Sequence, residues 1–115
     1  MGAIACNLFM STGSESRQGL INQAQGALLV TRFWYTRLVK ARDCVMTGMT
    51  RDGVFWVENG EVKYPVKNLR FTQSYVQALA DVQAVGDTDP LLKAQYREIY
   101  ARVPALLISR FRFTS

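Results

Sequence analysis

The sequence feature that most constrains the fold is a short β-hairpin near the middle of the chain. Val54–Val57 is a β-prone run, Glu61–Val66 is another, and Asn59 and Gly60 between them supply the two positive-φ residues that a type I′ turn requires. Pro65 has no N–H to donate to a neighbouring strand, so we expect the second arm to be an edge strand or to contain a bulge. The pattern predicts an antiparallel hairpin around which other strands assemble.

Further segments have strand patterns. Ala27–Val39 is the longest and carries large side chains on both faces, which predicts a central strand that is covered on both sides. Val45–Thr50 should return antiparallel to it after a turn. Ala105–Phe113 alternates between an apolar face and a face that becomes basic, and the apolar stretch Ala3–Met10 could pair as another strand.

Three segments have helical patterns. Ser14 can cap a first helix that runs to about Gln25. Ser74 and Gln77 form a capping box ahead of an apolar stripe, which predicts a second helix over residues 74–86. An Asp-Pro pair can begin a third helix over residues 89–102, which should end before the next proline.

Several separated blocks of the chain occur in the same order in a known family. Residues 26–39 read GALLVTRFWYTRLV and residues 50–74 read TRDGVFWVENGEVKYPVKNLRFTQS. The pattern continues through Asn7–Phe9, Ala78–Gly86 and the closing residues 103–115, VPALLISRFRFTS. These blocks resemble the C-terminal domain of the TldD/PmbA family of peptidases, in the branch that carries an RFWYTR-like strand.

The resemblance implies both a fold and a setting. The expected fold is α+β: a mainly antiparallel β-sheet of hairpins, sandwich- or barrel-like, with about three flanking helices. With 115 residues, we expect positions 1–115 to form a single TldD/PmbA C-terminal-like domain. In the family, paired subunits enclose a chamber in which extended or unfolded peptides are cut at a metal. The resemblance thus implies a homo- or heterodimer with a TldD/PmbA-type subunit or N-terminal half, with a scaffold role for this chain.

The residues needed for catalysis are not found in this sequence. The chain has no histidine, which removes Ser-His and Cys-His pairs and the commonest metal ligand. Cys6 and Cys44 are the only cysteines and have no CxxC spacing. The metal-bearing members of the family hold zinc with two histidines and a glutamate of the first half and a late cysteine of the second half, whereas residues 85–104 contain no cysteine. We therefore expect no cofactor in this chain, no catalytic residue and no activity of the chain alone.

Arg32, Trp34 and Arg37 are candidates for a substrate-groove or interface surface, chosen from their side-chain chemistry. The aromatic triplet at residues 33–35 between two arginines also suits a stacking surface for bases or peptide side chains, but core packing is the favoured interpretation. The net charge of +5 is spread along the chain, and no DNA-reading motif is present, although a label for the family connects it with DNA gyrase.

The alternatives to a peptidase domain are therefore a small basic nucleic-acid-binding module and a stand-alone interaction domain. No apolar run reaches the roughly 18 residues that a membrane helix needs, and no signal peptide is recognisable, so we expect no membrane partner and a cytoplasmic location.

Overall fold

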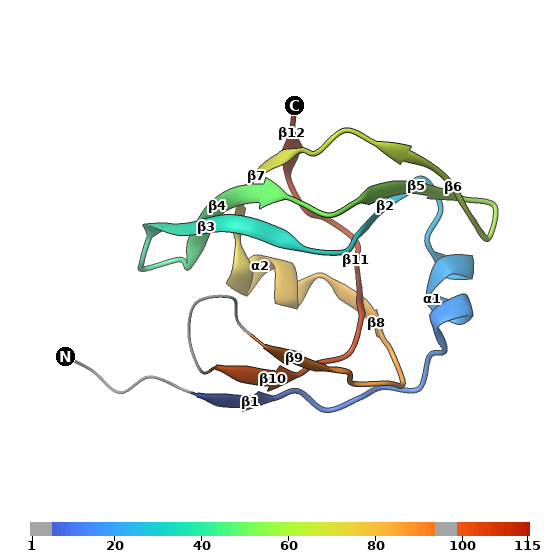
Figure 1. The fold of residues 1–115 in the computed structure, drawn as a ribbon, viewed down its shortest axis with the longest axis horizontal. Helices are drawn as coiled ribbons and strands as arrows, with labels where there is room; N and C mark the ends of the chain where they lie inside the picture. The colour runs from blue at the N-terminus through green and yellow to red at the C-terminus, as the bar shows by residue number, and fades with distance from the viewer. Residues whose placement is uncertain (1–5, 94–98) are drawn as a thin grey trace.

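The computed structural model describes residues 6–93 and 99–115, which form mainly antiparallel sheets and two short helices (Figure 1). In chain order the elements are β1 (Asn7–Phe9), α1 (Arg17–Gln23), β2 (Ala27–Val30), β3 (Phe33–Lys40), β4 (Val45–Thr50), β5 (Val54–Glu58), β6 (Glu61–Val66), β7 (Arg70–Ser74), α2 (Tyr75–Ala80), β8 (Val82–Val85), β9 (Leu91–Lys93), β10 (Tyr100–Arg102), β11 (Leu106–Ile108) and β12 (Phe113–Thr114).

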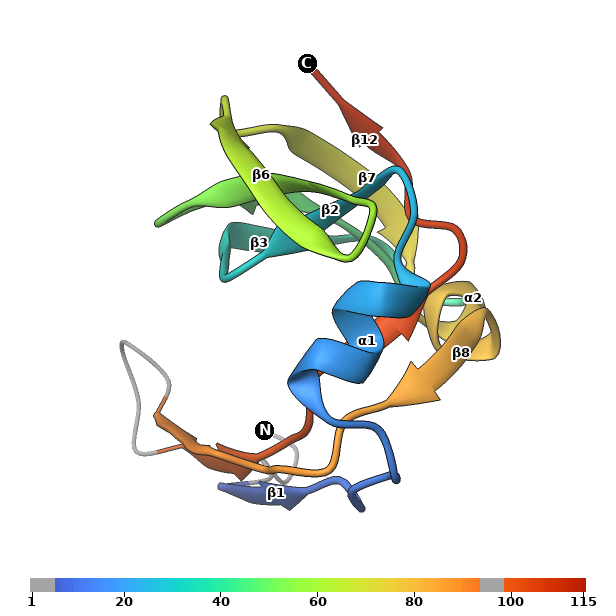
Figure 2. The same ribbon diagram turned by 90° about the vertical axis from the view of Figure 1, so that its right-hand side faces the viewer.

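The strands assemble into two larger and two smaller groups. One sheet has the order β12-β7-β4-β3 and another the order β2-β5-β6, and all of their pairs are antiparallel. Strands β1, β10 and β9 form a third sheet, in which β1 runs parallel to β10, and β8 pairs with β11. Figures 1 and 2 show the first two sheets on one side of the molecule and the β1-β10-β9 sheet on the other, with both helices between them. The predicted α+β class, mainly antiparallel, is confirmed, with two helices in the described residues where about three were expected.

The central hairpin forms as predicted. Strands β5 and β6 pair from Val54 opposite Val66 to the turn, where Asn59 and Gly60 have φ values of 53° and 73°. Strand β6 lies at the edge of its sheet, so the missing N–H of Pro65 interrupts no second ladder. The local turn chemistry was sufficient here because Asn-Gly adopts the left-handed conformation readily.

The prediction of one long central strand over Ala27–Val39 is wrong. The segment divides into β2 and β3, which belong to different sheets. In the described sheets each lies at an edge, and most residues of β3 are exposed. Alternation along the sequence did not reveal the division because both parts carry apolar side chains on both faces.

The division occurs at Thr31 and Arg32, where the chain crosses between the two larger sheets. The Thr31 hydroxyl lies 2.8 Å from the carbonyl oxygen of Gly53. It lies 3.2 Å from the carbonyl oxygen of Asp52 and 3.3 Å from that of Arg51. The N–H of Arg51 donates to the carbonyl of Arg32 at 2.9 Å. Residues 51–53 are themselves the second crossing, from β4 to β5, so these hydrogen bonds hold the two crossings together.

Both described helices are shorter than predicted. The N-cap of α1 is Ser16 rather than Ser14, because the Ser16 side chain accepts the N–H of Gly19 at 3.0 Å. Ser74 caps α2 as predicted, accepting the N–H of Gln77 at 3.2 Å, but α2 then ends and β8 follows, where β-branched valines pair with β11. Neither helix has the length and apolar character needed to cross a membrane.

The third predicted helix, over residues 89–102, is wrong wherever the structure describes it. Leu91–Lys93 and Tyr100–Arg102 are the antiparallel strands β9 and β10, and residues 94–98 lie outside the described residues. Pairing with β1 overrides the local helical pattern. The predicted last strand, Ala105–Phe113, also divides, into β11 and the start of β12, in different sheets.

An aromatic cluster around Phe71 forms the core of the β12-β7-β4-β3 sheet. The Phe71 side chain is fully buried, and its ring centroid lies 4.6 Å from that of Phe33, 5.5 Å from Phe111 and 6.5 Å from Tyr75. Burial also raises the pKa of the Tyr75 hydroxyl above its ordinary value. Gly48 of β4 lies directly opposite Phe71, where a Cβ would be 2.9 Å from the ring. The cluster therefore leaves no room for a side chain at this position of β4.

We expect Gly48→Ala to destabilise the protein by about 1–3 kcal/mol, because the added methyl must displace the Phe71 ring or the β3 backbone. Urea unfolding measures the change. The matched control is Gly19→Ala in α1, where the added Cβ meets the carboxylate end of Glu15, which can move, and lies 3.2 Å from the Ser16 hydroxyl, which needs to shift only slightly. That variant should gain about 1 kcal/mol from helix propensity. Equal stability of the Gly48→Ala variant and the parent would contradict the close packing described here.

Candidate functional site

A bulge in β3 shapes the surface that carries the predicted site residues. Trp34 pairs with Met49 and Arg37 with Thr47, so over this interval β3 contains one residue more than β4. Tyr35 lies inside the bulge with a φ of 58°, which is uncommon for an aromatic residue, and its side chain is 61% exposed. The bulge thus presents Tyr35 to solvent on an edge strand.

Three arginines stack on the two aromatic rings of this bulge. The Cζ atom of Arg51 lies 4.2 Å from the Trp34 ring centroid, and that of Arg32 lies 5.7 Å from it. On the other side of the bulge, the Cζ of Arg37 lies 4.1 Å from the Tyr35 centroid. Such contacts stabilise by about 0.5–1 kcal/mol at exposed sites. They also restrict the orientation of the guanidinium groups, because a cation over a ring face leaves its N–H donors toward its edges.

The positive charges of this surface fall into two groups. Asp52 lies 3.0 Å from Arg32 and 3.9 Å from Arg51, so one carboxylate serves both. Arg37 and Arg70 have no carboxylate within salt-bridge distance among the described residues. The second pair is therefore an uncompensated centre of positive charge.

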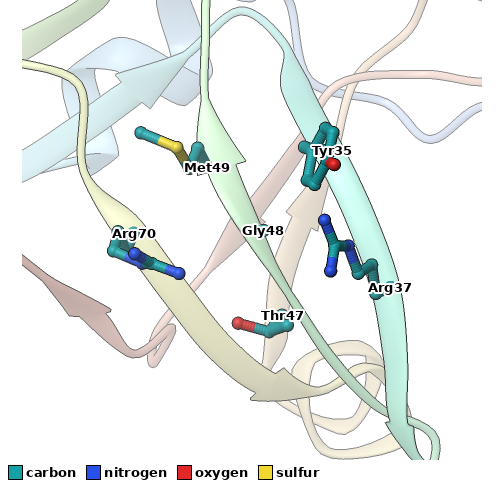
Figure 3. Close-up of a pocket in the computed structure, with 6 residues that line it drawn as sticks. All are labelled: Tyr35, Arg37, Thr47, Gly48, Met49 and Arg70. Carbon is teal, nitrogen blue, oxygen red and sulfur yellow. The ribbon is translucent and has the colours of Figure 1, made fainter.

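Arg37 and Arg70 both line a small depression on the solvent face of the sheet, with a volume of about 130 Å³. Figure 3 shows its lining: Tyr35, Arg37, Thr47, Gly48, Met49 and Arg70. At its base the Thr47 hydroxyl donates to the Phe71 carbonyl at 2.9 Å and lies 3.1 Å from the Thr72 hydroxyl. These bonds fix the Thr47 side chain, so the groups free to meet a ligand are the two guanidinium groups and the Tyr35 hydroxyl.

The structure places the three predicted site residues on one edge but in two settings. Arg32 and Trp34 are in contact beside the Asp52 ion pairs, whereas Arg37 lies beyond the bulge in the depression. Sequence reasoning missed the partners Tyr35, Arg51 and Arg70. Tyr35 belonged to a recognised aromatic triplet, but Arg70 could be found only by knowing that β7 pairs with β4.

Comparison with known proteins identifies the family. A family model described as PmbA/TldA metallopeptidase C-terminal domain matches residues 2–115. The chain belongs to this family. The match agrees with the resemblance to TldD/PmbA peptidases seen in the sequence. No curated protein matches the chain.

A similar solved structure is that of a protein from Bacteroides thetaiotaomicron described as a proposed modulator of DNA gyrase. The two share 22% identity with a TM-score of 0.72, over 92% of this chain. The match spans only 22% of that protein, so this PmbA/TldA-type chain corresponds in fold to about a fifth of its length.

The donor atoms present here do not fit the zinc that the name of the PmbA/TldA metallopeptidase family implies. Structural and catalytic zinc sites use cysteine, histidine and carboxylate ligands grouped within one coordination sphere. The chain has no histidine, and Cys6 and Cys44 are both exposed and form no disulfide. Within residues 6–93 and 99–115, no three cysteine, aspartate or glutamate side chains are grouped to hold a metal ion. The described part of the chain therefore offers no set of metal ligands to which a catalytic step could be assigned.

The stacking of Arg51 on Trp34 can be tested with a double-mutant cycle. We expect Trp34→Leu and Arg51→Met to show a coupling free energy of about 0.5–1 kcal/mol in urea unfolding, because each variant removes one partner of the cation–π contact. Trp34→Leu paired with Arg17→Met in α1 serves as the control and should be additive. A coupling indistinguishable from that control would mean that the contact adds nothing to stability.

Proposed function

We propose that residues 1–115 act as the C-terminal domain of a TldD/PmbA-type peptidase assembly that cleaves extended or unfolded peptides. The chain would supply scaffold and association surface, while the catalytic metal would belong to another part of the assembly. The observation that carries this proposal is the family match over residues 2–115. The unsuitable donor set supports the division of roles, since association surfaces need neither histidine nor grouped cysteines.

Exposed apolar side chains support an association role. On α2, Val76 and Leu79 are 61% and 57% exposed, and at the end of β3, Leu38 and Val39 are 58% and 59% exposed. The start of α2 contacts the β3–β4 turn, where the Tyr75 N–H donates to the carbonyl of residue 44 at 3.0 Å. Apolar groups gathered at one end of a sheet favour a partner surface. The proposed partner is a TldD/PmbA-type subunit, identical or not, or an N-terminal half.

The surface of Arg32, Trp34 and Arg37 is the proposed substrate-groove or interface surface. It follows the outer edge of β3, which has no strand partner in the described sheets and so keeps backbone groups that an extended peptide could pair with. A nucleic-acid role is less well supported, because guanidinium groups already occupy ring faces of Trp34 and Tyr35 that bases would stack on. The proposed location is the cytoplasm.

The division of roles predicts that the purified chain holds no stoichiometric zinc and does not cleave casein or other unfolded substrates. Protein made without a histidine tag should be used for elemental analysis and a cleavage assay. Tightly bound zinc, or cleavage that a chelator abolishes, would show that the chain contains a metal site of its own.

The association role predicts a sedimentation coefficient that rises with protein concentration. Leu79→Glu should shift the population toward monomer, because it places a charge among exposed apolar groups of α2. Gln83→Glu on β8 adds the same charge at an exposed polar position and should leave association unchanged. A monomer at every concentration would leave the chain without the proposed self-association.

A further inference from the structure

The depression between Arg37 and Arg70 has the features of a small anion site. The two residues lie on β3 and β7, the strands on either side of β4, with Arg37 opposite Thr47 and Arg70 opposite Met49. Neighbouring strands are about 4.8 Å apart, so each arginine side chain can reach over β4. Figure 3 shows both guanidinium groups extending toward β4 from opposite sides.

Nothing in the described protein neutralises these two groups. Within residues 6–93 and 99–115, neither arginine has a carboxylate within salt-bridge distance, and Asp52 is engaged with the other two arginines of the surface. The Cζ atom of Arg37 lies 4.1 Å from the Tyr35 ring centroid, and this contact restrains the guanidinium group while its N–H donors have no carboxylate partner among the described residues. An anion here would meet oriented donors that need little reorganisation.

The size of the depression restricts the anion. Pockets for cofactors and drug-sized ligands are typically about 300–1,000 Å³, whereas this one is about 130 Å³. It can take a single small group such as a carboxylate with its methylene stem, for which Met49 and the Tyr35 ring provide an apolar wall. A nucleotide base does not fit in this depression. Two arginines on either side of one strand also do not make a track of positive charge along a phosphate backbone.

We propose that Arg37 and Arg70 form a subsite for a carboxylate group of an extended peptide that lies along the edge of β3. The carboxylate would accept charge-assisted hydrogen bonds from both guanidinium groups. Each guanidinium has a planar fork of N–H donors that suits parallel bonds to carboxylate oxygens. This inference rests on the proposed peptide-binding role, which supplies the class of ligand. What it adds to that role is a preference for a carboxylate group. That group is either an Asp or Glu side chain or the C-terminal carboxylate of the peptide.

The test is a titration of the full 115-residue chain, labelled with ¹⁵N, with three matched peptides whose other residues are all neutral. One has a central Glu with both ends blocked, the second has Gln in its place, and the third is the Gln peptide with a free C-terminus. We expect saturable shifts of the Arg37 and Arg70 Nε–H resonances with the Glu peptide or with the free-ended peptide, and not with the blocked Gln peptide. Whichever carboxylate peptide binds identifies the source of the group.

Variants connect the binding to the site. Arg37→Gln with Arg70→Gln should weaken binding of the preferred peptide by about tenfold or more, because both charged donors are lost. Arg17→Gln with Arg110→Gln removes the same net charge from exposed positions elsewhere and should leave affinity unchanged. If the glutamine variant does not fold, Arg37→Lys with Arg70→Lys keeps charge and stem and should still weaken binding through loss of the paired geometry.

Three outcomes would overturn the carboxylate subsite. Equal affinity for the Glu, Gln and free-ended peptides would leave a peptide groove without this preference. Equal weakening in the Arg17→Gln/Arg110→Gln control would reduce the effect to net charge. Tighter binding of a single-stranded DNA 12-mer, lost in the Arg37→Gln/Arg70→Gln variant, would make the surface a nucleic-acid site. If no peptide binds, the subsite and the groove role both fail, while sedimentation still decides the association role separately.

Discussion

The contact between Phe71 and Gly48 is the packing constraint on which both faces of the largest sheet depend. Because a Cβ at residue 48 would lie 2.9 Å from the Phe71 ring, β4 packs opposite β7 without displacement of its neighbours only with glycine there. Side chains alternate between the faces of a strand, so fixing Gly48 toward the aromatic core fixes Thr47 and Met49 toward solvent. The same register places Arg70 beside Met49 on the solvent face. The core contact therefore determines which residues form the floor and one wall of the depression.

The bulge in β3 and the crossing at Thr31 determine how the charges on that face are distributed. The crossing brings Asp52 within 3.0 Å of Arg32 and 3.9 Å of Arg51, which offsets part of the positive charge beside Trp34. The bulge displaces Arg37 past Tyr35, away from Asp52 and toward β4. The end of the surface near Asp52 is thus an ion-paired contact between the two crossings. The end near Arg37 keeps positive charge that a ligand can neutralise. Surface ion pairs contribute only about 0–1 kcal/mol, so this distribution matters more for recognition than for stability.

The sequence predicted those parts of the fold that are determined by residues close together in the chain. The hairpin followed from Asn59-Gly60, and the N-cap of α2 followed from Ser74, because each feature involves neighbouring residues. The division of Ala27–Val39 depends on hydrogen bonds to residues about 20 positions away, and the β9–β10 pairing replaces a helix that the periodicity favoured. The site followed the same rule: Arg32, Trp34 and Arg37 were found as a cluster in sequence, while Arg70 required a pairing between distant strands that no local pattern encodes.

A domain without metal ligands can still influence which bond of a peptide is cut. An extended peptide advances about 3.3 Å per residue, and successive side chains point to opposite sides. If a carboxylate is held between Arg37 and Arg70, all remaining residues of that peptide have fixed positions along β3. A shift of the peptide by one residue would then move the carboxylate out of reach of the two arginines. In the proposed peptidase assembly, a catalytic centre on another part would then receive one register of the substrate in preference to others. Positioning of this kind lowers the entropic part of a reaction barrier without any chemical group from the positioning chain.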